Sequence, residues 1–331
     1  MSTGGLLLVV IIVVAIAFDF TNGFQDTANA VALTVSTRAL PPRLAVLVAA
    51  AANLAGAFAT VAVAKTVGKG IIDTGLANEH TILAALIGAI VWNLVVWRLG
   101  LPSSSSHALI GGLIGAALAQ SGSKGVQWHG LAHKVLIPAV FSPMFGFIAA
   151  FGLLLAIYWI FARATPRHVN HGFRIGQIAS GTWVAFVHGA NDAQKTMGVI
   201  ALALYEHGTI SHFYIPTWVK IAAGLAIGAG TYAGGWRVMR TLGQRVFKID
   251  PPSGFAAQAA GGTILYIATH LGYPVSTTHT ISGAVMGAGA TKRFSAVRWG
   301  VAGNIVRAWI FTIPATALLA AVAYWPIQGI F

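Results

Sequence analysis

The chain has 331 residues, of which 56% are apolar and only 8% are charged. An ordinary soluble domain carries about 25% charged residues, so this composition excludes a soluble enzyme or binding domain. The formal net charge is +13, and because the basic residues cluster in short loops it indicates orientation in a membrane rather than nucleic-acid binding. The chain has no cysteine, and this excludes both a disulfide framework and a thiolate metal site.

Long apolar segments recur from end to end, and many are long enough to cross the roughly 30 Å hydrocarbon layer as a helix. The first apolar run, 5–18, lacks a basic n-region and an A-x-A-like cleavage site, so we expect a span rather than a signal peptide. The elements expected in the first half are 4–20, a broken element near 22–36, 43–64, 80–99, 103–119 and 135–161. Those expected in the second half are a broken element at 174–205, then 217–236, 254–271, 276–290 and 299–325.

Two sequence motifs occur twice, in the same order. The segment 22–30 (NGFQDTANA) returns in altered form at 188–196 (HGANDAQKT), 166 residues later, and 102–107 (PSSSSH) returns at 274–279 (PVSTTH), 172 residues later. After each second motif the pattern stays in step, because Gly111 and Gly115 match Gly283 and Gly287. We therefore predict an internal duplication, with halves at about 1–165 and 170–331.

Each predicted half has about five membrane elements, and an odd number of crossings inverts the second half relative to the first. If both termini lie outside, the inside loops hold 13 Lys or Arg residues, at 37–43, around Arg98, 162–174, 237–248 and 292–298. The opposite loops hold only Lys65, Lys69, Lys124 and Lys134, with Lys220 just inside a span. This asymmetry follows the positive-inside rule and predicts an all-α, multi-pass inner-membrane protein with inverted repeats and both termini outside. Segments 103–119 and 276–290 are short, so each is either a re-entrant hairpin or a full span.

Polar residues at membrane depth are costly and are candidates for function. The first set is Asp19, Asn22, Gln25, Asp26 and Asn29, and the matching set is His188, Asn191, Asp192, Gln194 and Lys195. Each follows an apolar run and contains a glycine, which is typical of a helix that unwinds to line a cavity. The alternatives are an interhelical hydrogen bond for each polar group and, for Lys195, a side chain that snorkels to the interface.

The second pair of clusters is rich in hydroxyl groups, and its members are Ser103, Ser104, Ser105, Ser106 and His107, with Ser276, Thr277, Thr278 and His279. Each cluster follows a proline and precedes a Gly/Ala-rich helical run. Hydroxyl groups together with the free N–H groups of a helix N-terminus can bind an oxyanion, above all phosphate or sulfate. The alternative is simple helix capping. Arg307 lies in the last span, and the sequence gives it no function.

These motifs resemble those of the inorganic phosphate transporter (PiT) family, whose duplicated signature is G-A-N-D-x-A-N-A. The second copy keeps Gly189, Ala190, Asn191 and Asp192, and the first copy keeps Asp26, Ala28, Asn29 and Ala30. The departures from the signature resemble the bacterial low-affinity branch, and the resemblance covers essentially the whole chain. It implies an inverted-repeat fold, a homodimer, and symport of phosphate with H⁺ or Na⁺, in part as a neutral divalent-metal complex. No resident metal or cofactor is expected.

The resulting hypothesis is alternating access around a central oxyanion site. The expected phosphate ligands are Gln25, Asn191, Ser104, Ser105, Ser106, Ser276, Thr277 and Thr278. The expected coupling residues are Asp26, Asp192, Lys195, Asn22, Asn29 and, more weakly, Asp19. Lys195 stands where the family signature has Asn, and a fixed positive charge repels Na⁺, so H⁺ is favoured. Sulfate as cargo, Na⁺ as coupling ion and an intramembrane hydrolase remain alternatives, although no G-x-S-x-G segment supports the hydrolase.

Overall fold

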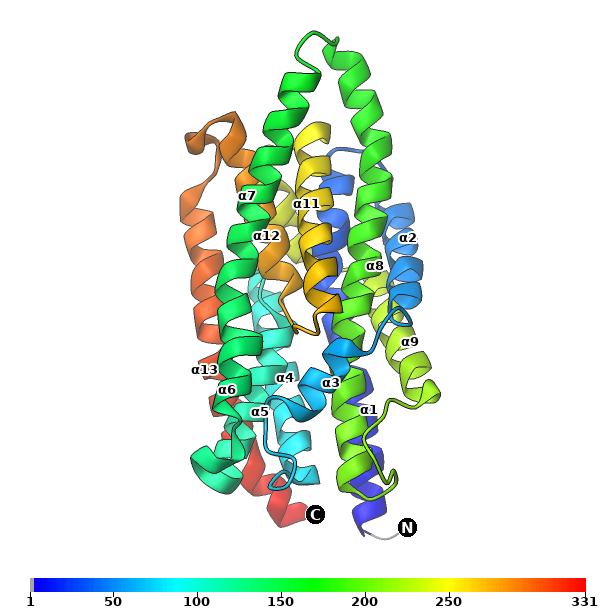
Figure 1. Cartoon of the computed structure of the whole chain (residues 1–331), viewed down its shortest axis with the longest axis vertical. Coiled ribbons are helices and arrows are strands. Elements are labelled where there is room, and N and C mark those ends of the chain that lie inside the picture. Colours follow the sequence, from blue (N-terminus) through cyan, green and yellow to red (C-terminus); the bar gives the residue numbers. More distant parts are fainter. Residues whose placement is uncertain (1–2) are drawn as a thin grey trace.

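The computed structural model describes residues 3–331 and folds them into a helical bundle (Figure 1). The first-half helices are α1 (Thr3–Ser36), α2 (Pro42–Gly56), α3 (Ala62–Lys69), α4 (Glu79–Leu99), α5 (Ser105–Ser121), α6 (Trp128–Leu131) and α7 (Ile137–Ile160). The second-half helices are α8 (Pro166–Glu206), α9 (Thr217–Ala233), α10 (Trp236–Arg240), α11 (Pro251–His270), α12 (Thr277–Lys292) and α13 (Trp299–Ile330). The predicted all-α fold is confirmed.

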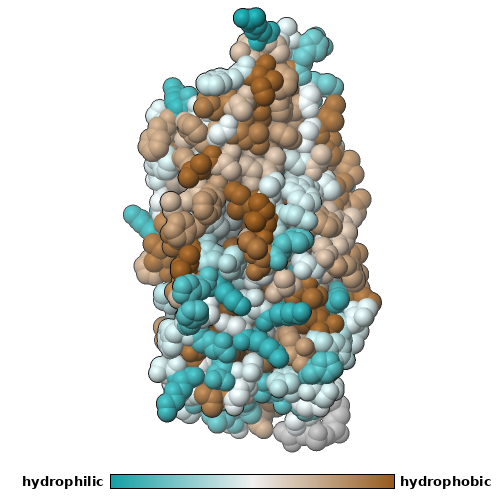
Figure 2. Space-filling model, viewed as in Figure 1, coloured by the Kyte–Doolittle hydropathy of each residue, from teal (hydrophilic) through white to brown (hydrophobic). Residues whose placement is uncertain are grey.

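Four helical stretches in the described residues are long and apolar enough to cross a membrane: Gly4–Ser36, Glu79–Leu99, Trp128–Ile160 and Trp299–Ile330. Large apolar side chains are exposed along α7 and α13, including Val140, Ile148, Ile310 and Leu318. Figure 2 shows apolar residues over the middle and upper part of one face and polar residues gathered near its lower end. Lipid would cover such a surface in a membrane, so the exposure agrees with a multi-pass protein.

The two glycine motifs do not break their helices, contrary to the prediction. Helix α1 runs without interruption through Gly23, and α8 does the same through Gly189. A Cβ on Gly23 would lie 2.4 Å from the Ile227 carbonyl oxygen in α9, and one on Gly189 would lie 2.0 Å from that of Asn53 in α2. These glycines therefore allow close helix packing. The interruptions fall instead between α2 and α3 and between α9 and α10.

Helices α5 and α12 begin in the interior of the molecule and run to opposite ends of it (Figure 1). The C-terminal end of α5 bonds the loop before α4, because Gln120 Nε2 donates to the Leu76 carbonyl at 2.5 Å. The C-terminal end of α12 is held to the start of α11 by an ion pair of 2.5 Å between Lys292 and Asp250. Each helix thus returns beside the one before it, an arrangement that matches the hairpin reading of these two segments.

The long last helix of each half packs against a helix of the other half. Helix α7 packs against α12, and α13 packs against α5. The matched glycines make both contacts possible, since a Cβ on Gly115 would lie 1.9 Å from the Ala317 carbonyl oxygen and one on Gly287 would lie 2.1 Å from that of Phe147. This agreement is consistent with repeats at 1–165 and 170–331, and the division itself stays a prediction.

The loops 37–43, 162–174 and 292–298, which were predicted to lie inside, lie toward one end of the bundle, and the chain termini lie at the other (Figure 1). The Arg298 N–H donates to the Val246 carbonyl at 2.9 Å, which joins the 237–248 and 292–298 loops. Partial burial would raise the pKa of Asp250, but bonds from Lys292 and Ser253 outweigh it and hold that pKa below its usual value. Which end faces the cytoplasm stays a prediction.

Candidate functional site

The N-termini of α5 and α12 meet in the centre of the bundle. Ser104 and Ser276 are their N-caps, and each side-chain oxygen accepts the N–H three residues on, at 3.1 Å, from His107 and His279 respectively. The two imidazole rings meet edge to face, with centroids 4.6 Å apart and an interplanar angle of 77°. Each cluster thus caps a helix, and the two helices direct the positive ends of their dipoles at a shared point.

The motif carboxylates lie against these helix starts, and hydroxyl groups from both clusters reach them. Thr278 donates to Asp26 Oδ1 at 3.0 Å, and Ser105 contacts Asp26 Oδ2 at 3.4 Å. Thr277 contacts Asp192 Oδ1 at 3.3 Å. All five side chains are buried. The structure therefore joins the acidic and hydroxyl-rich motifs of both halves in one site, although they are far apart in sequence.

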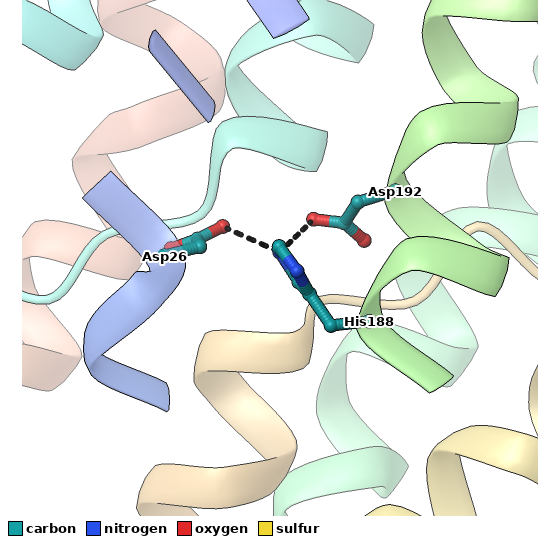
Figure 3. Close-up of side chains that lie close together, drawn as sticks. All are labelled: Asp26, His188 and Asp192. Carbon is teal, nitrogen blue, oxygen red and sulfur yellow. Dashed lines mark ion pairs between the residues drawn. The ribbon is translucent and has the colours of Figure 1, made fainter. Parts of the chain in front are cut away.

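His188 stands between the two carboxylates (Figure 3). Its Nε2 lies 3.3 Å from Asp192 Oδ2 and 3.9 Å from Asp26 Oδ2. Its Nδ1 lies 2.7 Å from Asn53 Oδ1, and Asn53 Nδ2 donates to the Thr231 hydroxyl at 3.1 Å. Asn53 orients the imidazole from α2, 135 positions away in the chain, so no local signal in the sequence identifies it.

One donor atom from each of Asp26, His188 and Asp192 lies within 4.8 Å of the others, a spacing that could hold a cation. The 3.3 Å contact between His188 and Asp192 is close to hydrogen-bond length, so a proton could be shared there, whereas the 3.9 Å distance from His188 to Asp26 is too long for a hydrogen bond. Sequence reasoning placed His188 in the motif but gave it no role.

Lys195 is 1% exposed and points into the site. Its ammonium group contacts Asp192 Oδ1 and Ser106 Oγ and donates to the Val275 carbonyl at 3.2 Å. A snorkelling lysine is therefore excluded. A carboxylate, a hydroxyl and a carbonyl oxygen are also the ligand types that hard cations take, so the ammonium occupies a position suited to a small cation.

The remaining predicted residues divide into two groups. The first group bonds other side chains. Asn29 Nδ2 donates to Thr278 Oγ1 at 2.9 Å and to Asp26 Oδ1 at 3.2 Å. Asn191 Nδ2 donates to the Thr269 hydroxyl of α11 at 2.8 Å. Asp19, Asn22 and Gln25 are buried, and their side-chain polar atoms bond no protein group.

Two residues that the sequence singled out lie away from these bonds. Ser103 bonds Thr312 of α13 at 2.8 Å. Arg307 is exposed on the outer face of α13, where it donates to Asn304 at 3.3 Å, so it is not part of the site.

Comparison with known proteins shows the family of this chain. A model of the phosphate transporter family matches residues 22–320. The chain belongs to this family. It is 51% identical over 321 residues to a probable low-affinity inorganic phosphate transporter of Rhizobium meliloti, covering 96% of each chain. It is 42% identical to the protein of that name from Bacillus subtilis, covering 98% of each.

A solved structure, a sodium-dependent phosphate transporter, superposes with a TM-score of 0.91 at 25% identity, covering 98% of this chain and 100% of that one. The resemblance found in the motifs is thereby confirmed. These relatives are transporters rather than enzymes, so the hydrolase alternative is set aside.

Proposed function

We propose that this family member imports inorganic phosphate across the inner membrane by H⁺ symport. The observation that carries the proposal is the buried contact set of Asp26, His188, Asp192 and Lys195 at the start of two inward-pointing helices. The names of the relatives support phosphate as the cargo. The proposal places both termini outside and both halves around one central site.

Phosphate would bind at the N-termini of α5 and α12. Backbone N–H groups and the hydroxyls of residues 104–106 and 276–278 would bind its oxygens, as helix N-termini do for many anions. The Gln25 amide has no hydrogen-bond partner within residues 3–331 and would be able to bind the ligand. Asn191 would have to leave Thr269 to bind, so its role as a ligand requires a side-chain rotation.

Proton coupling follows from competition for hydroxyl donors. Thr277 and Thr278 bond the Asp192 and Asp26 carboxylates, and an oxyanion would need the same donors. An ionised carboxylate next to phosphate is also repulsive. Protonation of the carboxylate–imidazole cluster removes both obstacles, because a carboxylic acid repels less and accepts more weakly. A proton would therefore enter with each phosphate.

Lys195 supports H⁺ over Na⁺ as the coupling ion. Its ammonium already contacts the three oxygen atoms that could hold a cation at this point, on Asp192, Ser106 and Val275. A tethered charge cannot leave with the substrate, so it neutralises Asp192 permanently. The name of the matching solved structure favours Na⁺, and Na⁺ coupling is therefore the second candidate.

Reconstituted protein tests the proposal directly. Labelled phosphate uptake into proteoliposomes would be measured under an inward H⁺ gradient and, separately, under an inward Na⁺ gradient. Uptake driven by H⁺ alone supports the proposal, and uptake that requires Na⁺ overturns the coupling ion. The Asp26→Asn variant, which removes the carboxylate that Lys195 does not neutralise, should lose the pH dependence.

Three further parts of the proposal need separate experiments, namely the cargo, the divalent metal and the homodimer. Competition by arsenate and by sulfate separates phosphate from sulfate as the cargo. Uptake with and without Mg²⁺ tests whether a divalent-metal complex is carried. The mass of the protein in detergent tests the proposed homodimer.

A further inference from the structure

Asp19 is a buried carboxylate that makes none of the bonds described above. It is 0% exposed, and neither carboxylate oxygen has a hydrogen bond of good geometry within the described residues, although Thr196 and Asn22 lie close to it. It lies on α1 seven residues before Asp26, two helical turns or about 10 Å along the axis, so it shares that residue's face. It lies on the side of the site nearer the chain termini.

The polar groups around Asp19 also lack protein partners. Both amide atoms of Asn22 and of Gln25 are buried and unbonded, and so is the Thr196 hydroxyl of α8. Asn22 and Thr196 are near enough to act on Asp19. A buried polar group without a hydrogen bond is costly, so a tract with several of them is suited to bridging by water. The tract leads from Asp19 to Asp26.

Beyond Asp19 the polar tract ends. The buried side chains of α1 and α8 toward the termini are apolar and include Ile11, Ala15, Met197 and Ile200. Asp19 is therefore the last titratable group before a closed apolar seal. If the end with the termini faces outside, Asp19 is the first carboxylate that an incoming proton meets when that seal opens.

Asp19 forms no ion pair within the part of the chain that the structure describes. His188 and Asp192 of α8 act on it, and Lys195 is already bonded to Asp192. The other helices packed against α1 carry their charged or titratable residues near their ends: Arg43 in α2, Glu79, His80 and Arg98 in α4, Lys220 and Tyr232 in α9, Arg237 and Arg240 in α10, Arg245 after α10, Tyr266 and His270 in α11, and His279 and Lys292 in α12.

The duplication provides an internal comparison. Asp26 and Asp192 are 166 residues apart, and the same offset from Asp19 leads to Ala185, which is also buried. The second half places a methyl group where the first half has a carboxylate. Helix packing at this position therefore does not require an acid, which points to a role in transport.

We infer that Asp19 is a second proton-binding residue, which takes up a proton from the outside and passes it through the polar tract to the Asp26–His188–Asp192 cluster. The inference rests on the proposed H⁺ symport. In the step, a proton binds an Asp19 carboxylate oxygen, moves along hydrogen bonds of the tract to His188 or Asp26, and leaves Asp19 ionised. No bond between heavier atoms forms or breaks, and no electron is transferred.

The test separates net transport from exchange. Net phosphate uptake driven by a pH gradient needs protons to cross, whereas exchange of labelled for unlabelled phosphate at equal concentrations and equal pH does not. We expect Asp19→Asn to lower net uptake about 100-fold, the scale of a lost proton-transfer group, and to keep exchange close to wild type. Asp19→Glu should restore net uptake. Asp73→Asn, in an acid outside the bundle core that accepts a bond from the Gly75 N–H, is the control.

Three outcomes would overturn the assignment of Asp19 as a proton-binding residue. Net uptake by Asp19→Asn at the wild-type rate overturns the inference, and so does an equal loss of uptake and exchange, since that indicates a structural role. Loss of Na⁺-driven but not pH-driven uptake would assign Asp19 to a Na⁺ site and also overturn it. If the wild-type protein itself shows no pH-driven uptake, the proposed function has failed instead.

Discussion

Replacement of Lys195 by Met removes the buried ammonium group and keeps an unbranched side chain of similar length. Asp192, which is 0% exposed, would lose its ion-pair partner and retain contacts of 3.3 Å from the Thr277 hydroxyl and the His188 imidazole. Removal of one partner from a buried ion pair costs about 3–5 kcal/mol, because the other charge is left buried. We expect Lys195→Met to be strongly destabilised.

A second substitution tests the reason for that loss. Asp192→Asn in the Lys195→Met background removes the orphaned charge, so the double variant should be more stable than Lys195→Met alone. The assay is the unfolding temperature of purified protein in one detergent, followed by tryptophan fluorescence. A double variant that is less stable than Lys195→Met, or a single variant as stable as wild type, would refute the reasoning that charge pairing holds these residues together.

Three further predictions follow from individual contacts. Thr278→Val removes a hydroxyl from the proposed anion site and should raise the KM for phosphate about tenfold. The control is Thr280→Val, because the Thr280 hydroxyl bonds the start of its own helix and its loss should leave the KM unchanged. Uptake kinetics measure both. Gly287→Ala places a Cβ 2.1 Å from the backbone of α7 and should cost about 1–3 kcal/mol, seen as a lower unfolding temperature, while Gly152→Ala, with open space around it, should cost little. The pKa of Asp250 is lowered in the folded protein, so this carboxylate stabilises the folded state fully above its unfolded pKa of about 3.9, and the stabilisation is lost as the pH falls below that value. The unfolding temperature of wild type should therefore fall with acid more than that of Asp250→Asn does.

Local features of the site could be predicted from the sequence. The hydroxyl clusters were expected to lie at helix starts because each follows a proline and precedes a Gly/Ala-rich run, and Ser104 and Ser276 are the N-caps of those helices. The duplicated motifs also led to the same centre, since matched segments in two halves meet when the halves pack around one point. These signals depend on a few neighbouring residues, so a single sequence contains them.

The positions of Gly23 and His188 required the structure. A glycine beside polar residues is compatible with an unwound helix and equally with a close helix crossing, and only the distance to α9 decides for the crossing. His188 takes its orientation from Asn53 on another helix, and a contact across 135 residues leaves no local pattern. Polar groups at membrane depth indicate that a site exists, but their pairing depends on how the helices pack.

The exchange of α7 and α13 between the halves has a consequence for how the protein is made. The face of α5 that carries Gly111 and Gly115 packs against α13, which is synthesised long after α5. Until then the first 165 residues hold a groove without its helix, and α7 has no α12 to lie against. The packing of each half is therefore complete only when both are present, and neither one alone contains the whole proposed site.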